Sequence, residues 1–292
     1  MSRLSPQSDI VIRFRQDSVK PYMAPAAQHA APHFHYQHEL LLPVEGSAEF
    51  EISGRRYQAA PGCLLFMSNL ENHSVVSSST GFARYIMRFS NEALAVYLRD
   101  PLLLSVFKQR PEGFCHRYLC RERELAAYLR LARQMEREYR RQAPCWDQMV
   151  VSGLLAILVG IYRTDPTFFP GHRGAEGQNL IFDVQNYIEG NLQGDLSLDA
   201  VSARFFVNRY HLSHLFPQVT GYTFKSYILM ARISKAKDLL LSTDREVRSV
   251  SEAVGFHSVS HFIRTFRKME ELSPLQYRGQ VRRREGAPEA AT

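Results

Sequence analysis

Residues 247–269 read VRSVSEAVGFHSVSHFIRTFRKM, and residues 198–220 read LDAVSARFFVNRYHLSHLFPQVT. The two stretches repeat one pattern of apolar and small residues at a period of about fifty residues, which is the signature of a duplicated structural unit. Each stretch predicts a short helix, a tight turn and a second helix with polar residues outward. The sequence therefore predicts two helix-turn-helix units in one helical domain.

The second unit separates an apolar face from a polar one. Four apolar residues recur at helical spacing and should face a core: Val259, Phe262, Phe266 and Met269. Gly255 suits the turn because glycine adopts positive φ at little cost, and Ser258 can cap the helix. A second helix of this kind can enter a DNA major groove, where arginine donates two hydrogen bonds to guanine. We expect Arg264 to contact bases.

A basic outward face on a single helix is as often a solvated surface as a binding surface. The duplication favours DNA binding, because two recognition helices about 34 Å apart can enter consecutive major grooves. Residues 224–240 predict the helix that joins the units, since their apolar residues keep helical spacing without glycine or proline.

Five further motifs lie in and around the two units: DLSL at 195–198, TGYTF at 220–224, ARISKAKDLL at 231–240, AVGF at 253–256 and SPLQYR at 273–278. In these motifs the last hundred residues resemble the AraC/XylS transcriptional regulators. The resemblance implies a seven-helix DNA-binding domain, with base-contact positions at Tyr210, Ser213 and His214 and at Ser260, His261 and Arg264. The full set of expected DNA-binding residues is Arg209, Tyr210, His211, Ser213, His214, Ser260, His261, Arg264, Arg267 and Lys268.

Four residues depart from the family pattern. Pro217 lies inside the first recognition helix, which we expect to bend or end early. Phe206 stands at a turn position where the family carries small or Asn-like residues, and Glu271 replaces the glycine that ends the second recognition helix. His214 stands where the family often has arginine. We therefore expect the second unit to contribute more of the sequence specificity than the first.

Composition agrees with a nucleic-acid partner. The chain has 36 Lys and Arg against 29 Asp and Glu, a formal charge of +7, so DNA binding should weaken as salt rises. Its 292 residues predict a domain at 1–165, a linker at 166–177 and a DNA-binding domain at 178–292. The absence of a long apolar run or signal core predicts a cytoplasmic protein without a membrane partner. The four cysteines predict reduced thiols and no zinc site: Cys63, Cys115, Cys120 and Cys145.

The amino-terminal half predicts short strands followed by helices. Strands are expected at 48–52, 56–58, 64–67 and 83–89, which favours a cupin-like barrel or double-sheet jelly roll. Residues 124–139 and 147–162 predict helices. The resemblance to AraC-like regulators places the contacts of a homodimer on these two helices.

A second resemblance lies near the start of this barrel. His33, His35, Glu39 and Gly46 are spaced as in the first cupin motif, and His73 falls at the end of the second. Metal-binding cupins hold one divalent ion on three such histidines and the glutamate, which are suitable ligands for zinc, iron or manganese. AraC-like sensor barrels instead hold a small organic effector, often a sugar, without metal. We assign the effector-binding residues as His33, His35, Glu39 and His73, with no metal or other cofactor.

The predicted function is a regulator whose promoter binding responds to a small molecule in the barrel. Its expected partners are double-stranded DNA, the effector and a second copy of the chain, with RNA polymerase as a further candidate. The alternative is a metal-dependent cupin enzyme, or a metal sensor, fused to a DNA-binding module. No nucleophile–base pair or carboxylate dyad is recognisable elsewhere, so the prediction is a protein that is not an enzyme. Metal content would separate the two hypotheses.

Overall fold

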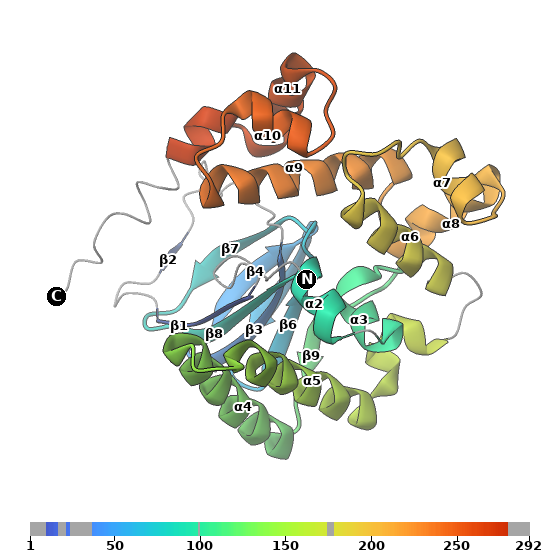
Figure 1. Cartoon of the computed structure of the whole chain (residues 1–292). Helices are drawn as coiled ribbons and strands as arrows, with labels where there is room; N and C mark the ends of the chain where they lie inside the picture. Colours follow the sequence, from blue (N-terminus) through green and yellow to red (C-terminus); the bar gives the residue numbers. More distant parts are fainter. Residues whose placement is uncertain (1–9, 17–21, 24–36, 99, 174–177, 280–292) are drawn as a thin grey trace. The chain divides into compact units, whose positions relative to one another are not determined.

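The computed structural model describes residues 10–16, 22–23, 37–98, 100–173 and 178–279 (Figure 1). The chain divides into two compact units. The amino-terminal unit is Met1–Phe182 with Leu215–Gly221, and the carboxyl-terminal unit is Asp183–His214 with Tyr222–Thr292.

The amino-terminal unit contains two antiparallel sheets. The first has the order β1 (Ile10–Gln16), β8 (Ala83–Ser90), β3 (Gln37–Glu45), β6 (Cys63–Met67) and β9 (Arg117–Leu119). The second has the order β2 (Tyr22–Met23), β7 (His73–Ser78), β4 (Ala48–Ile52) and β5 (Arg55–Ala59). The predicted β domain with two sheets is confirmed, whereas the jelly-roll connectivity stays a prediction.

A buried apolar cluster draws on strands of both sheets. Its members include Leu41 of β3 and Leu65 of β6 in one sheet, and Phe50 and Ile52 of β4 in the other. Because successive side chains of a strand point to opposite faces, Glu39 lies on the same face of β3 as Leu41. The register pairs His73 with Ile52 across β7 and β4, so His73 shares the face of Ile52. We call the space between these two faces the barrel interior.

Helices pack against the opposite face of the first sheet. They are α2 (Asn91–Tyr97), α3 (Pro101–Lys108), α4 (Glu122–Arg141) and α5 (Trp146–Thr164). Leu40 and Phe66 of the sheet form one buried cluster with Met135 of α4 and Leu154 of α5. Helices α4 and α5 can approach closely because residue 153 is glycine: a Cβ atom there would lie 2.7 Å from Met135 Cγ. Both predicted helices are therefore present.

Within the described part of the chain, α5 is the one helix whose length and hydropathy would suit a membrane span. Its residues Val150, Leu154, Ile157 and Ile161 are fully buried in the cluster on the first sheet. Helix α5 is thus a core helix of this unit.

The predicted linker begins with two short 3-10 helices, η1 (Pro166–Phe168) and η2 (Pro170–Arg173). Phe169 between them is fully buried and packs edge-on against Tyr162. The first half of the predicted linker therefore packs on the amino-terminal unit.

The carboxyl-terminal part is helical. It comprises α6 (Gln178–Gly190), α7 (Leu198–Arg204), α8 (Arg209–Thr220), α9 (Phe224–Ser242), α10 (Val247–Ala253) and α11 (Val259–Glu270), and residues 274–279 are also helical. Hydroxyl caps begin three of these helices: Ser197 accepts from the N–H of Ala200, Thr223 from Ser226, and Ser258 from His261. Helices α7–α8 and α10–α11 are the two predicted helix-turn-helix units, and α9 is the predicted helix between them.

Helix α8 continues past Pro217 to Thr220, so it does not end early, and the bend at Pro217 stays a prediction. Proline removes one backbone donor, but the turn that follows is satisfied. The Pro217 carbonyl accepts the N–H of Gly221 at 2.9 Å, and the Thr220 hydroxyl donates to the Phe216 carbonyl at 2.8 Å. Burial of Phe216 and Val219 holds this last turn in place.

Candidate nucleic-acid interface and effector site

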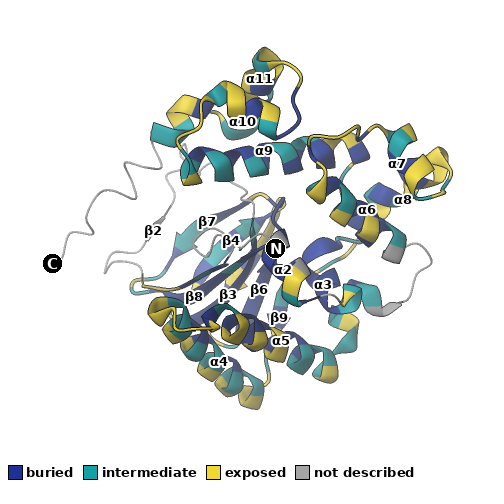
Figure 2. Ribbon diagram, viewed as in Figure 1, coloured by how far each residue is buried: buried dark blue, intermediate teal, exposed yellow. Residues whose placement is uncertain are grey.

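Helix α11 has one buried and one exposed face, as the sequence predicts. Phe262 and Phe266 are fully buried, and their rings stack edge-on with Phe256 and Tyr277. Val259 and Met269 are half-buried. The outward residues predicted to contact DNA are all exposed (Figure 2): Ser260, His261, Arg264, Arg267 and Lys268. The structure therefore brings these five side chains onto one accessible helix face.

The turns of the two units hold the same backbone conformation with different residues. Gly255 has φ +84°, and a Cβ atom there would lie 1.9 Å from the carbonyl oxygen of Leu192. At the matching position of the first unit, Phe206 has φ +55° with its side chain 95% exposed. A left-handed backbone costs a non-glycine residue about 1–2 kcal/mol. The turn at Gly255 thus requires glycine both for its positive φ and because a Cβ atom has no room. The turn at Phe206 has the positive φ but leaves room for a side chain.

Glu271 ends α11 in the left-handed conformation that glycine usually provides. Its φ is +58°, and its N–H donates to the Arg267 carbonyl at 2.9 Å. The helix therefore ends where the family pattern places its end, with the conformational strain carried by Glu271.

Helix α8 presents fewer free cations than α11. Tyr210 is 70% exposed, and His211 and His214 are also exposed. Arg209 is exposed but lies 2.8 Å from the carboxylate of Asp199 in the preceding helix. Ser213 is half-buried, and its hydroxyl donates to the Tyr210 carbonyl at 2.9 Å. The side chains of Arg209 and Ser213 therefore already have polar partners within the chain.

Helix α9 connects the two helix pairs as one uninterrupted rod (Figure 1). Lys237 of α9 forms a buried ion pair with Glu270 of α11, with Nζ and Oε2 2.7 Å apart. Burial lowers the pKa of Lys237 and raises that of Glu270, while each charge partly offsets the effect of burial on the other. This contact orients α11 on the rod.

Two of the four predicted effector-binding residues lie in the barrel interior. Glu39 is buried and accepts a hydrogen bond from Nε of Arg88 at 2.6 Å, directly across β3 and β8. His73 is buried, and its Nδ1 hydrogen-bonds the Glu71 carbonyl at 3.0 Å. His33 and His35 lie outside the described residues. Among the residues that are described, no group of three or more His, Cys, Asp or Glu is placed to hold a metal ion.

Sequence reasoning missed the arginines of this interior. Arg84 and Arg88 alternate with Tyr85, Met87 and Phe89 along β8, and those three belong to the cluster under the helices. Arg84 is buried, and its guanidinium lies 4.7 Å from the centre of the Phe82 ring. The period-two alternation of the predicted strand was the available signal, because it puts both arginines on the interior face.

A buried charged cluster lies beside the interior and was also missed. Arg110 donates to both carboxylate oxygens of Glu71, with Nε–Oε1 2.5 Å and Nη2–Oε2 2.7 Å. The Ser68 N–H and His116 Nε2 each lie 2.6 Å from the same carboxylate. Burial alone would raise the pKa of Glu71, but the Arg110 charge and these hydrogen bonds outweigh it and hold the pKa below its usual range.

Two histidines near this cluster are neutral. Burial lowers the pKa of His116 despite the Glu71 carboxylate, and its Nδ1 lies 2.9 Å from the hydroxyl of Tyr57. Burial and then the Lys108 charge lower the pKa of His38 to about 3. The His38 Nδ1 accepts the N–H of Asn69, so its Nε2 carries the proton shared with Asn91. Both histidines therefore act as neutral hydrogen-bonding groups beside the Glu71–Arg110 pair.

Known proteins resemble both halves of the chain. A family described as an AraC-like ligand binding domain matches residues 20–143, and one described as a helix-turn-helix domain matches residues 201–280. The HTH-type transcriptional regulator YijO of Escherichia coli (strain K12) is 34% identical over 106 residues, which is 36% of this chain and 38% of that protein. The right origin-binding protein of the same strain is 34% identical over 99 residues, 34% of each chain. The chain thus spans little more than a third of the length of these relatives.

Solved structures of ToxT match nearly the whole chain. ToxT from Vibrio cholerae O395 covers 94% of this chain and 98% of its own, with a TM-score of 0.59 and 13% sequence identity, so the likeness is one of fold. Together with the geometry of α7–α11 and the two-sheet domain, these matches show that the chain belongs to the AraC family, with an AraC-like ligand binding domain followed by a helix-turn-helix domain.

Proposed function

We propose that this chain is a transcriptional regulator that binds duplex DNA through α8 and α11 and responds to a small molecule in the barrel interior. The observation that carries the proposal is the pair of exposed polar helices joined by the rod α9. Each helix buries one apolar face and leaves its polar face to solvent, as a major-groove reader must. We place the protein in the cytoplasm, where it can reach promoter DNA, and we assign it no catalytic step.

A footprint of the purified protein tests this proposal directly. Each chain should protect close to two helical turns of its own upstream region, because α8 and α11 would enter consecutive grooves. Protection of a single turn would mean that α8 does not dock.

Replacing Arg264 should weaken specific binding more than replacing His214. Arg264 is exposed and has the bidentate donor geometry that guanine accepts, whereas the imidazole of His214 lacks this paired-donor geometry. We expect Arg264→Ala to weaken binding to the cognate site by about 1–3 kcal/mol and to relax specificity at one position. The measurement is fluorescence anisotropy with cognate and scrambled duplexes at fixed salt. His214→Ala is the matched variant. A larger loss of affinity for the cognate duplex in His214→Ala than in Arg264→Ala would contradict the assignment.

The effector site is proposed at His33, His35, Glu39 and His73, with Arg88 as an addition from the structure. The Glu39–Arg88 pair is partly accessible, since the Arg88 side chain is about one-third exposed. A hydroxyl or carboxylate of a polar effector can replace Glu39 as the acceptor from Arg88, and a hydroxyl can replace Arg88 as the donor to Glu39. This supports a polar metabolite over a purely apolar one.

We also propose that the chain forms a homodimer through α5. Met149 and Leu155 are 43% and 37% exposed on its outer face, and the small residues Ser152 and Ala156 between them permit close helix packing. RNA polymerase remains a further proposed partner, reached once two copies are bound at a promoter.

A charge on the outer face of α5 should separate the two copies. Leu155→Arg would bury an unpaired guanidinium in the proposed interface, so we expect the dimer dissociation constant to rise at least about tenfold. Sedimentation velocity across a concentration series measures this. Leu155→Met, which keeps the apolar surface, should remain dimeric, and an equal effect of both variants would place the interface elsewhere.

A further inference from the structure

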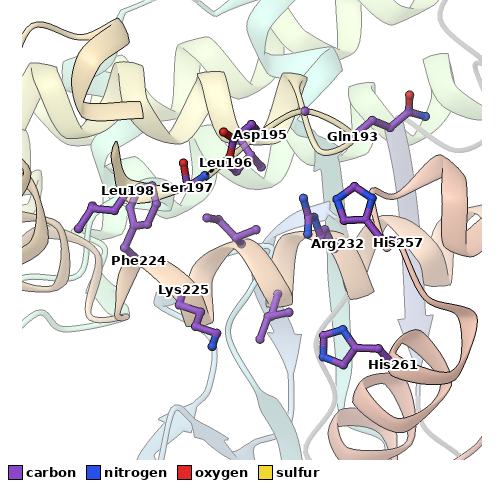
Figure 3. Close-up of a pocket in the computed structure, with 13 residues that line it drawn as sticks. Gln193, Asp195, Leu196, Ser197, Leu198, Phe224, Lys225, Arg232, His257 and His261 are labelled. Atoms are coloured by element: carbon purple, nitrogen blue, oxygen red, sulfur yellow. Dashed lines mark hydrogen bonds between the residues drawn. The ribbon is translucent and has the colours of Figure 1, made fainter. Parts of the chain in front are cut away.

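A groove of about 640 Å³ lies within the carboxyl-terminal unit, along one face of α9 (Figure 3). One wall is the segment 193–198 before α7, and the other is formed by His257 and His261 at the start of α11. Both helix-turn-helix units therefore contribute to a single concave site. Its volume falls within the range typical of small-molecule sites.

The floor of the groove is apolar. It is formed by Leu196, Phe224 and Ile228, which are buried by the fold, with Leu229 half-buried beside them. A floor of this kind offers no partner to a phosphate or to water, but it lowers the free energy of an aliphatic or aromatic body laid on it. The observation favours an occupant that is mostly hydrocarbon.

The rim of the groove is cationic. Lys225 lies at one end and Arg232 at the other, beside His257 (Figure 3). The two cations are seven residues apart on α9, which corresponds to about 10 Å along a helix. The Nε of Arg232 donates to the Leu192 carbonyl at 3.1 Å, which holds the guanidinium at its end of the groove.

One carboxylate, that of Asp195, lines the groove within the described residues. It accepts the Ser197 N–H at 2.8 Å, and this hydrogen bond lowers the pKa of Asp195. Asp195 therefore stays ionised, but its single negative charge is set against the two positive charges of Lys225 and Arg232. A neutral or cationic apolar molecule would leave them without a partner.

We propose that the groove binds an amphipathic carboxylate, such as a medium-chain aliphatic acid. The hydrocarbon lies along Phe224 and Ile228, and the carboxylate accepts hydrogen bonds from Arg232 and His261. This is a second ligand site, separate from the barrel interior and located in the unit that contains the recognition helices.

The site also predicts how the ligand acts, and this step rests on the proposed function. His261 lines the groove and is one of the residues assigned to DNA on α11. A carboxylate bound to His261 occupies the imidazole donor that is assigned to DNA. It also places a negative charge beside the DNA phosphates. Bound acid and bound DNA should therefore exclude each other.

The test titrates decanoate, kept below its micelle concentration, into the full-length protein by isothermal titration calorimetry. Three variants accompany the wild type. Leu229→Trp fills the groove, Arg232→Gln removes the charge but keeps an N–H donor for the Leu192 carbonyl, and Lys268→Ala removes an exposed cation of α11 outside the groove. Decyltrimethylammonium provides a probe with the same chain and the opposite charge.

We expect decanoate to bind the wild type and Lys268→Ala equally, to bind Arg232→Gln about tenfold more weakly, and not to bind Leu229→Trp. The cationic probe should not bind. Decanoate should also weaken DNA binding by the wild type.

Three results would overturn the proposal. They are no decanoate binding to the wild type, equal binding to the wild type and Leu229→Trp, or binding of the cationic probe as tightly as decanoate. If the wild type takes up no decanoate and Leu229→Trp also loses DNA binding, the groove belongs to the DNA interface. DNA binding measured without decanoate tests the regulator function separately, so failure of one does not imply failure of the other.

Discussion

Gly255→Ala should destabilise the α10–α11 pair by about 3 kcal/mol or more. The added Cβ would lie 1.9 Å from the Leu192 carbonyl oxygen, and this neighbour is backbone that cannot rotate away. The positive φ at Gly255 adds the strain of a left-handed alanine. Because the clash lies at the turn, the loop before α7 and the start of α11 must move apart.

Hydrogen exchange of the full-length protein measures this effect locally. The amides of α10 and α11 should lose protection in Gly255→Ala, and specific DNA binding should fall with them. The matched variant is Phe206→Gly, at the same position in the first unit. There the side chain is exposed and the backbone is already left-handed, so we expect unchanged stability or a gain of up to about 1 kcal/mol. Native protection in Gly255→Ala would show that the turn does not contact Leu192.

Glu71→Gln should lower the free energy of unfolding of the amino-terminal unit by about 3–5 kcal/mol. The Glu71 side chain is 1% exposed and is the shared partner of Arg110, His116 and the Ser68 N–H. Glutamine removes the charge that compensates Arg110, whose own side chain is 8% exposed. A buried guanidinium without its carboxylate is expensive in free energy because it has lost its water.

Urea denaturation followed by circular dichroism measures this loss. Glu49→Gln is the matched control, since Glu49 also pairs with an arginine, Arg56, but at 3.5 Å on the surface. That change should cost less than about 1 kcal/mol. Equal effects of the two substitutions would mean that the buried cluster contributes no more than a surface pair.

The pH dependence of stability separates the contributions of Glu71 and His38. The pKa of Glu71 is lower in the folded state, so its contribution is present above the usual carboxyl range near 4.5 and is lost as pH falls below it. The pKa of His38 falls from 6.5 to about 3 on folding, so stability declines as pH falls from 6.5 towards 3. In Glu71→Gln the free energy of unfolding should therefore still decline as pH falls below about 6.5, but without the additional decline below about 4.5.

The two helix-turn-helix units are the part of the fold that sequence predicted most completely. Local signals were sufficient there: helical spacing around Phe262 and Phe266, a cap at Ser258 and a glycine at 255. Pro217 misled the prediction, because a local rule for proline does not include the burial that keeps the last turn of α8 formed.

The β domain was predicted in part. Strands with one exposed face, such as β4 and β5, alternate visibly between apolar and polar residues. Strand β3 was missed because both its faces are buried, so its sequence HELLLP shows no alternation. Helix α3 was missed as well, although Asp100 caps it and Pro101 opens it, which is a readable start signal.

By itself the sequence determined the duplication, the rod between the two units and the polar residues of each recognition helix, because these depend on neighbours within a few turns of one helix. Tertiary structure alone decided which groups share a site. Glu71 lies 39 residues from Arg110 and 45 from His116 along the chain, yet it forms one buried cluster with them. Gly255 is obligatory because the Leu192 carbonyl lies against it. Such contacts join residues that are distant in sequence, so they depend on the tertiary fold and leave no periodic pattern in the sequence.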